Sequence, residues 1–386
     1  MKPRAAVTGL AVLAASLSVR VAHAIQQLDP TVRLLEELVN ADGASGFEGP
    51  VRDILKREWG PLVSDLRTDG MGNLLGTLPG QADAPRVLLM AHMDEVGFLV
   101  RHIDENGFVY MHNVGGYIDQ SVLTQRFTIT TPRGPVVGYT GMKSGHIVSA
   151  EERSRMVPLQ DMFLDIGVGS RAQAEALGVR PGLPVTYRTR FEVLNGTNRY
   201  LARAWDDRVG LAVITDAVRQ LAAQPHPNTV QIAATVQEEI GLRGAAVVHA
   251  STRPDIVINL EIGIASDFPL LTSPRLAQEA LGKGPAIFVF DGSMIPNNKY
   301  VEWIVRLARE SGIPIQFESV TGYGQDGSRL QQSGQGIPSV NLGVPTRYGH
   351  SQSGVIDRGD YDNTVKLVVR MIQRLSAAEV RSIREF

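Results

Sequence analysis

The feature that most limits the possible folds of this chain is an uncharged run at residues 230–236, which is followed closely by two adjacent glutamates, Glu238 and Glu239. The run has the length and composition of a buried strand, and Gly241 and Gly244 mark the turn that ends it. Successive side chains of an extended segment point to opposite sides. The two carboxylates can therefore take different roles in one site, one as a metal ligand and the other as a proton acceptor. A solvated acidic turn at a strand end is the alternative interpretation.

The first 24 residues have the pattern of a signal peptide. Lys2 and Arg4 form a basic start, residues 5–18 form an apolar run, and Ala-His-Ala at 22–24 has the form of a cleavage site. The run is too short to span a bilayer comfortably. We therefore expect an exported protein, periplasmic or secreted, that is cleaved after residue 24. The alternative is a frayed N-terminal helix in a cytosolic protein.

Composition excludes several classes of protein. The 386 residues are 43% hydrophobic and 20% charged, as in a globular protein with a large core, and this length predicts two domains or one domain with an insertion. The net charge is −2, and losing the first 24 residues, with their three basic and no acidic side chains, would make it −5. We expect neither a nucleic acid nor a membrane as a partner, because no basic cluster is present. Cysteine is absent, so any metal must be bound by histidines and carboxylates.

Strand-like and helix-like segments alternate along most of the chain. Apolar runs typical of buried strands lie at 86–91, 230–236, 255–260 and 338–345. Between residues 98 and 193 the pattern changes to short alternating runs separated by Gly, Pro and Asn, which predicts a small β-rich module. We therefore expect an α/β fold with a mixed sheet sandwiched by helices. Residues 25–97 and 194–386 would form the catalytic domain, and 98–193 an inserted β-rich domain.

Histidines and acidic residues follow these strands at the point where each strand ends: His92, Glu238, Glu239, Glu261 and His350. Asp206 lies at the entry of a predicted helix. In open α/β sheets, ligands bind outside the carboxyl ends of the strands, so we expect these side chains to converge. Their N and O donors suit Zn, Co or Mn and are enough for a pair of metals about 3.5–4 Å apart. Each residue also has a structural interpretation, because Asp206 or Asp207 can cap the helix and His92 can pair with Asp94 in the core.

Several motifs together resemble the tetrahedral (TET-type) and glutamyl aminopeptidase family, whose relatives are also labelled endoglucanase-like. They are Ser-Gly-Phe-Glu at 45–48, Gly-Asn-Leu at 72–74, Ala-His-Met-Asp-Glu-Val-Gly at 91–97, Trp-Asp-Asp-Arg at 205–208, Gln-Glu-Glu-Ile-Gly-Leu-Arg-Gly at 237–244 and Pro-Thr-Arg-Tyr-Gly-His-Ser at 345–351. The resemblance covers nearly all of the chain after residue 24, and the segment at 161–178 resembles part of the family's inserted domain.

The resemblance implies a set of metal ligands. His92 and Glu261 would bind one metal, and Glu239 and His350 the other. Asp206 would bridge the two, and the peptide bond that follows such a bridging residue is often cis. The family usually has Asp where this chain has Glu261, and the longer side chain could alter the preference for a metal or the affinity.

The resemblance also implies a reaction. Glu238 would be the general base, Asp94 would orient His92, and a metal-bridging hydroxide would be the nucleophile. The expected function is a binuclear, Zn- or Co-dependent aminopeptidase (Mn is possible) that acts on peptides with a free N-terminus and forms a homo-oligomer, from a dimer up to a larger assembly. The alternatives are a metal-dependent deacylase or carboxypeptidase on the same site, an endoglucanase and a non-catalytic binding protein.

Overall fold

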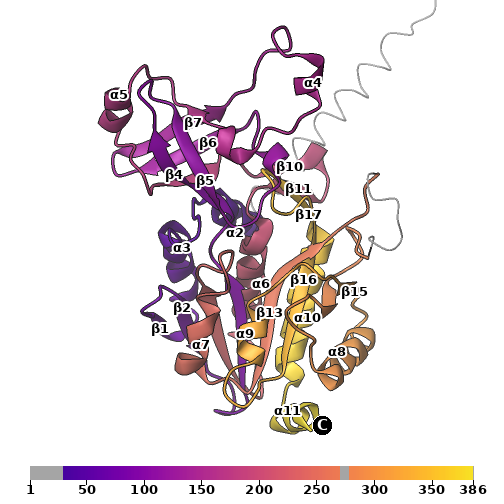
Figure 1. Cartoon of the computed structure of the whole chain (residues 1–386). Coiled ribbons are helices and arrows are strands. Elements are labelled where there is room, and N and C mark those ends of the chain that lie inside the picture. Colours follow the sequence, from indigo (N-terminus) through magenta and orange to yellow (C-terminus); the bar gives the residue numbers. More distant parts are fainter. Residues whose placement is uncertain (1–28, 270–277, 386) are drawn as a thin grey trace, which may run out of the picture.

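The chain folds into an α/β body and a smaller β-barrel that stands on one end of it (Figure 1). This arrangement comes from a computed structural model, which describes residues 29–269 and 278–385. The chain passes from the body into the barrel directly after β3 (Arg86–His92) and returns to the body through β10 (Glu192–Val193). The residue that ends β3 is therefore also close to the junction of the two parts.

The body is built on one sheet, which has eleven strands within the described residues. Its order from edge to edge is β1 (Ser64–Thr68), β2 (Leu74–Leu78), β12 (Thr229–Thr235), β3, β13 (Ile256–Ile264), β16 (Ser339–Arg347), β17 (Gly354–Asp357), β11 (Arg199–Ala202) and β10. Beside this path, β14 (Ala286–Phe290) pairs with β16 and with β15 (Gln316–Ser319).

The four central strands, β12, β3, β13 and β16, run parallel to one another. They consist of apolar and β-branched residues and are buried along almost their whole length, as expected for parallel strands covered on both faces. In register, Thr235 pairs with His92, and Glu261 pairs with Gly343. The carboxyl ends of all four strands consequently meet at one edge of the sheet.

Helices cover both faces of this sheet. The larger core cluster contains residues of α2 (Pro30–Asn40), α3 (Gly49–Trp59), α6 (Trp205–Leu221), α8 (Asn298–Glu310), α10 (Arg358–Arg374) and α11 (Ala377–Arg384). The opposite face packs against α7 (Ala245–Thr252) and α9 (Gly327–Gln331). Successive residues of β3 point to opposite faces of the sheet. Leu89 packs in the first cluster, and its neighbours Leu88 and Met90 pack in the second. No helix in the described part of the chain has the length and apolar composition needed to cross a membrane.

The barrel closes on itself and has its own core. Its strands follow the order β4 (Gly97–Ile103), β5 (Val109–Val114), β8 (Leu164–Asp165), β7 (Gly134–Thr140), β6 (Arg126–Thr131) and β9 (Pro184–Tyr187). Phe98, Phe127 and Val185 pack inside it. The same region contains α5 (Arg171–Ala176) and α4 (Ala150–Arg153), and α4 lies on an arm that projects from the barrel (Figure 1).

The predicted fold class is therefore confirmed: a mixed sheet lies between helices, and a small β-rich module is inserted in it. The domain boundaries at residues 97/98 and 193/194 stay a prediction. The predicted signal peptide at 1–24 lies outside the described residues.

Candidate metal centre and active site

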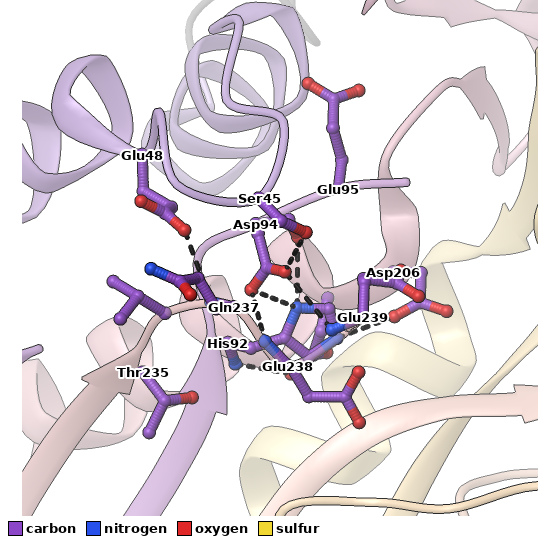
Figure 2. Close-up of polar contacts among 12 residues, drawn as sticks. Ser45, Glu48, His92, Asp94, Glu95, Asp206, Thr235, Gln237, Glu238 and Glu239 are labelled. Carbon is purple, nitrogen blue, oxygen red and sulfur yellow. Dashed lines mark hydrogen bonds and ion pairs between the residues drawn. The ribbon is translucent and has the colours of Figure 1, made fainter. Parts of the chain in front are cut away.

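The structure brings all the predicted site residues to the carboxyl edge of the parallel strands. His92 ends β3, Glu261 lies in β13, and the loop after β12 carries Glu238 and Glu239. His350 follows β16, and Asp206 lies in the first turn of α6. Most of this group is drawn in Figure 2, where it surrounds Asp94.

Asp206 lies between the two histidines. Its Oδ1 is 2.8 Å from Nε2 of His92, and its Oδ2 is 3.0 Å from Nε2 of His350. A second carboxylate faces each histidine, because Glu261 Oε1 lies 3.4 Å from His92 Nε2 and Glu239 Oε2 lies 3.4 Å from His350 Nε2. The site is thus two histidine–glutamate pairs on either side of one shared carboxylate.

Backbone carbonyl groups orient both imidazole rings. Nδ1 of His92 lies 3.0 Å from the carbonyl oxygen of Asp94, and Nδ1 of His350 lies 3.0 Å from that of Gly116. A carbonyl oxygen only accepts hydrogen bonds, so each Nδ1 must carry a proton, and Nε2 is the ring nitrogen that faces the carboxylates of the site. A metal that replaced the Nε2 proton would leave each ring as the Nδ1–H tautomer, which these carbonyl groups stabilise.

The Asp94 carboxylate holds the loop that carries the two glutamates. Its Oδ1 accepts a hydrogen bond from the backbone N–H of Glu238 (3.0 Å), and its Oδ2 accepts one from Glu239 (3.2 Å) and one from the Ser45 hydroxyl (2.6 Å). These contacts are dashed in Figure 2. The predicted contact with His92 is also present, mainly through the Asp94 carbonyl group, since the carboxylate is 3.5 Å from Nδ1.

Glu48 supports the same loop from the side of α3. Its Oε1 accepts hydrogen bonds from the N–H groups of Gly46 (2.6 Å) and Gln237 (3.2 Å). Gln237 has a positive φ of 55°, which is unusual for a residue with a side chain. Ser45 and Glu48 belong to a motif that the sequence analysis noted without assigning roles, because single hydrogen bonds to backbone groups leave no pattern in a sequence.

The sequence left open which of Asp206 and Asp207 caps the helix and which faces the metal site. In the structure Asp206 faces the two histidines and Asp207 is the cap. The peptide bond between them is cis, as the resemblance implied. Asp207 caps α6 through Oδ1, which accepts from Gly210 N (3.0 Å), and its Oδ2 accepts from His92 N (3.3 Å). Asp207 also lies close enough to His92 and Glu261 to form a possible ligand group with them, a proximity that the sequence did not predict.

The carboxylates outnumber the cationic groups at this site, and their pKa values reflect the imbalance. Burial raises the pKa of Glu239 to about 8 and that of Glu261 to about 7. Burial alone would lower the pKa of His350, but the charges of Glu239 and Asp206 raise it to about 10. Burial also raises the pKa of Glu238 well above its usual range, and within the described residues its carboxylate accepts no hydrogen bond.

These residues fit a divalent metal. His92 forms one possible ligand group with Asp207 and Glu261 and another with Asp206 and Glu239, and in each group the ligand atoms lie within 4.8 Å of one another. Oε1 of Glu239 is buried without a hydrogen-bond partner in the described part of the chain, so it is free to bind a cation. The nitrogen and oxygen donors are those that Zn, Co and Mn accept.

Comparisons with known proteins find one family of peptidases. The model of the M42 glutamyl aminopeptidase family matches residues 72–367. The chain is 34% identical to FrvX of Escherichia coli (strain K12), over 92% of this chain and 98% of that protein. It is 31% identical to the lysyl aminopeptidase of Pyrococcus furiosus, over 89% of this chain and 96% of that protein.

Solved structures give the same result. A TET aminopeptidase from a marine sediment archaeon (Thaumarchaeota) superposes with a TM-score of 0.88 at 37% identity, over 92% of this chain and all of that one. The TET1 peptidase of Pyrococcus horikoshii, described as assembling into a tetrahedron or a large octahedral shell, has a TM-score of 0.81 at 31% identity, over 89% and 100%. A Thermotoga maritima protein named endoglucanase has a TM-score of 0.74 at 29% identity, over 90% and 99%.

The fold and the site define a hydrolase with a histidine–carboxylate centre at the edge of an α/β sheet. The chain belongs to the M42 glutamyl aminopeptidase family, and it is a hydrolase that acts on peptide bonds. The family and the group of His, Asp and Glu residues together indicate that it uses a divalent metal.

The comparisons contradict one prediction, namely that the protein is exported, and they give no support to the signal peptide predicted at residues 1–24. The relatives, which include FrvX, the Pyrococcus lysyl aminopeptidase and the TET peptidases, are cytosolic oligomeric peptidases. A basic start followed by a short apolar run is also compatible with an N-terminal helix, and its composition alone does not separate the two.

Proposed function

We propose that this protein is a two-metal aminopeptidase that removes the N-terminal residue from peptides with a free amino terminus. The observation that carries the proposal is the position of Asp206, whose two carboxylate oxygens each face Nε2 of a different histidine, at 2.8 and 3.0 Å. A carboxylate in this position can bridge two cations, with one histidine bound to each.

In the proposed centre, Asp206 is the bridging ligand. His92 and Glu261 complete one half, and Glu239 and His350 complete the other. Asp207 supports the first half through the backbone of His92 and the start of α6. Zn and Co are the metals that we expect, with Mn as a further possibility, because the ligand set is entirely N and O. Two such ions would polarise the substrate carbonyl group and stabilise the developing oxyanion.

Glu238 is the proposed general base, and the difference between it and its neighbour supports this role. Glu239 faces His350, whereas the carboxylate of Glu238 accepts no hydrogen bond within the described residues and is free to take a proton. Glu238 takes the proton of the attacking water and later returns it to the leaving amine. Asp94 keeps Glu238 in place through the backbone, so it is a positioning residue as well as a support for His92.

The same geometry disfavours a glycosidase. Glycoside hydrolysis needs two carboxylates on either side of the scissile bond, about 5–10 Å apart. The adjacent Glu238 and Glu239 do not supply an obvious pair of that kind, and the two histidines would have no role. Cellulose hydrolysis that resists a chelator would favour the endoglucanase alternative.

We further propose that the protein is a homo-oligomer, that residues 98–193 form the inserted domain, and that this domain takes part in assembly. The relatives that superpose include a dodecameric TET1 and one that forms closed shells. Exposed apolar side chains gather on the barrel and its arm, and the most exposed are Ile118, at 67%, and Ile147, at 74%. A second copy of the chain would cover them. Light scattering on the purified protein measures the size of the assembly directly.

The activity is tested with a panel of aminoacyl-anilides. The protein is stripped with a chelator and supplied separately with Zn, Co and Mn. The proposal predicts that metal restores hydrolysis of anilides with a free amino group and not of their N-acetylated analogues. If the protein binds two equivalents of metal but cleaves no free aminoacyl-anilide, the aminopeptidase assignment is wrong, and a deacylase or carboxypeptidase on the same site takes its place.

A further inference from the structure

We propose that a loop of the barrel, residues 115–117, positions one half of the metal centre by orienting His350 and packing beside Glu239. This inference rests on the two-metal site proposed above and assigns it a dependence on the inserted barrel. The loop follows β5 and reaches the site from the barrel, so both of its contacts cross between the two parts of the molecule.

The first contact fixes the ring of His350. The carbonyl oxygen of Gly116 lies 3.0 Å from His350 Nδ1 on the side of the ring opposite to Asp206. The other polar contacts that the described residues give the His350 ring are the carboxylates of Asp206 and Glu239 at Nε2, and its side chain is 34% exposed. His92, by contrast, is 1% exposed and held within the body. The Gly116 carbonyl group is therefore the contact that sets both the orientation and the tautomer of His350.

The second contact is the packing of Gly115 against Val96, beside Glu239. Gly115 has a φ of 88°, and a Cβ atom built on it would lie 3.4 Å from Cβ of Glu239 and 2.6 Å from Cγ1 of Val96. The 2.6 Å to Val96 leaves no room for a side chain, so only glycine fits there without a shift, and the loop lies beside Glu239. The hydroxyl of Tyr117 donates to the Val96 carbonyl group (2.8 Å) and fixes the other end of the loop.

The barrel loop contacts only one of the two halves of the proposed metal centre. His350 and Glu239 belong to one proposed metal, and within the described residues no hydrogen bond joins this loop to His92 or Glu261. A further hydrogen bond, from the Thr189 hydroxyl to Gln352 Oε1 (3.0 Å), ties the segment after β9 to the turn that carries His350. A displacement of the barrel loop should consequently weaken one metal site more than the other.

Gly115→Ala tests this directly, because its Cβ would lie 2.6 Å from Val96 and push the loop away from there, and so away from His350 and Glu239. The matched control is Gly134→Ala, which lies in the same barrel and has a positive φ of 113°, but whose added Cβ meets no atom within 4 Å. Both full-length variants are stripped with a chelator and titrated with Zn²⁺ alone by calorimetry. We expect the control to bind two equivalents like the wild type. We expect Gly115→Ala to keep one tight equivalent and to bind the second about 10- to 100-fold more weakly.

Two equivalents bound by Gly115→Ala with wild-type affinities would overturn the proposal. If Gly115→Ala does not fold, as judged by circular dichroism, Tyr117→Phe decides, because it removes one anchor of the loop and keeps the ring stacked on Phe98. Tyr117→Phe should weaken the binding of the second Zn²⁺ equivalent and leave the first unchanged. Wild-type affinity for both equivalents would reject the proposal. A wild type that binds two metals without cleaving peptides would refute the proposed function and leave this inference standing. A wild type that binds fewer than two would remove its basis.

Discussion

The carboxylate of Asp94 lies directly beneath the backbone of Glu238, with 3.0 Å between Oδ1 and the amide nitrogen, and its other oxygen accepts from the amide of Glu239. Asp94 has no solvent exposure, and the Ser45 hydroxyl provides a further hydrogen bond. One buried carboxylate therefore sets the backbone that carries the proposed base and a proposed ligand.

Asp94→Asn should destabilise the protein and lower its turnover. An amide replaces one accepting oxygen by an NH₂ group, which faces N–H donors and leaves them unsatisfied. Hydrogen bonds to a charged group contribute about 1.5–3 kcal/mol each, so we expect a loss of at least about 2 kcal/mol in the free energy of unfolding. Urea denaturation of the metal-free protein measures it. Ser45→Ala, which removes a single donor, should cost less, about 1.5 kcal/mol at the lower end of that range, and equal effects of the two changes would contradict this account of Asp94.

Glu95→Gln should be strongly destabilising. Glu95 accepts from Arg203 Nη1 with both oxygens at 2.9 Å, and Arg208 lies 3.5 Å away. All three side chains are buried, so the variant leaves two arginines without their shared partner. Breaking a buried ion pair on one side costs about 3–5 kcal/mol.

The matched control is Glu152→Gln, which breaks the exposed pair with Lys143 on the barrel arm. It should leave the free energy of unfolding unchanged within error, because water and salt screen an exposed pair. Denaturant unfolding compares the two variants, and a loss below about 1 kcal/mol for Glu95→Gln would show that the buried network contributes little to stability.

Removing the metal should lower the stability of the wild type. A ligand that binds only the folded state adds about 2.7 kcal/mol when its concentration is a hundredfold above its Kd. A chelator should therefore lower the melting temperature, and Asp206→Asn, without the bridging carboxylate, should respond much less. An equal response of both proteins would mean that the metal acts elsewhere.

Glu279 should make stability depend on pH. Burial raises the pKa of Glu279 well above its usual range, and the neighbouring carboxylate of Glu318, with which it can share a proton, raises it further. The unfolded chain loses this proton near pH 4.3. Above that pH the native state binds more protons than the unfolded state, so the contribution to stability falls as the pH rises toward the folded pKa.

Glu279→Gln has no proton to lose and can still donate to Glu318. It should gain stability relative to the wild type between pH 5 and pH 8, by about 1.4 kcal/mol for each unit of pKa shift covered. Unfolding curves at the two pH values measure the gain, with the exposed Glu310→Gln as a control for the removal of one charge. A difference between variant and wild type that does not change with pH would refute the shared proton.

The sequence predicted the fold class because the apolar runs of β3, β12, β13 and β16 alternate with helical patterns. It also predicted that His92, Glu239 and His350 lie close together, because the carboxyl ends of parallel strands meet at one edge of the sheet. These inferences depend only on local patterns and one topological rule.

Other features depend on long-range geometry. The role of Gly116 lies in a backbone carbonyl group, which every residue has, so the sequence carries no sign of it. The division of roles between Asp206 and Asp207 depends on the backbone at the start of α6, where Ala204 has a φ of 54°. Closure of the barrel needs β9 to pair with both β4 and β6, which lie far away in the chain. The incorrect prediction of export came from composition alone at residues 1–24, where the structure describes nothing.

The most direct test of the account compares Glu238→Gln with Glu239→Gln, because it asks whether two adjacent carboxylates have different roles. Metal content and turnover of a free aminoacyl-anilide are measured on the same samples. The account predicts that Glu238→Gln keeps both metals and loses turnover at least about a hundredfold, as expected for removal of a general base. Glu239→Gln should bind one of the two metals at least about tenfold more weakly, as expected when a ligand is lost. Near-normal turnover of Glu238→Gln with both metals bound would contradict the central claim.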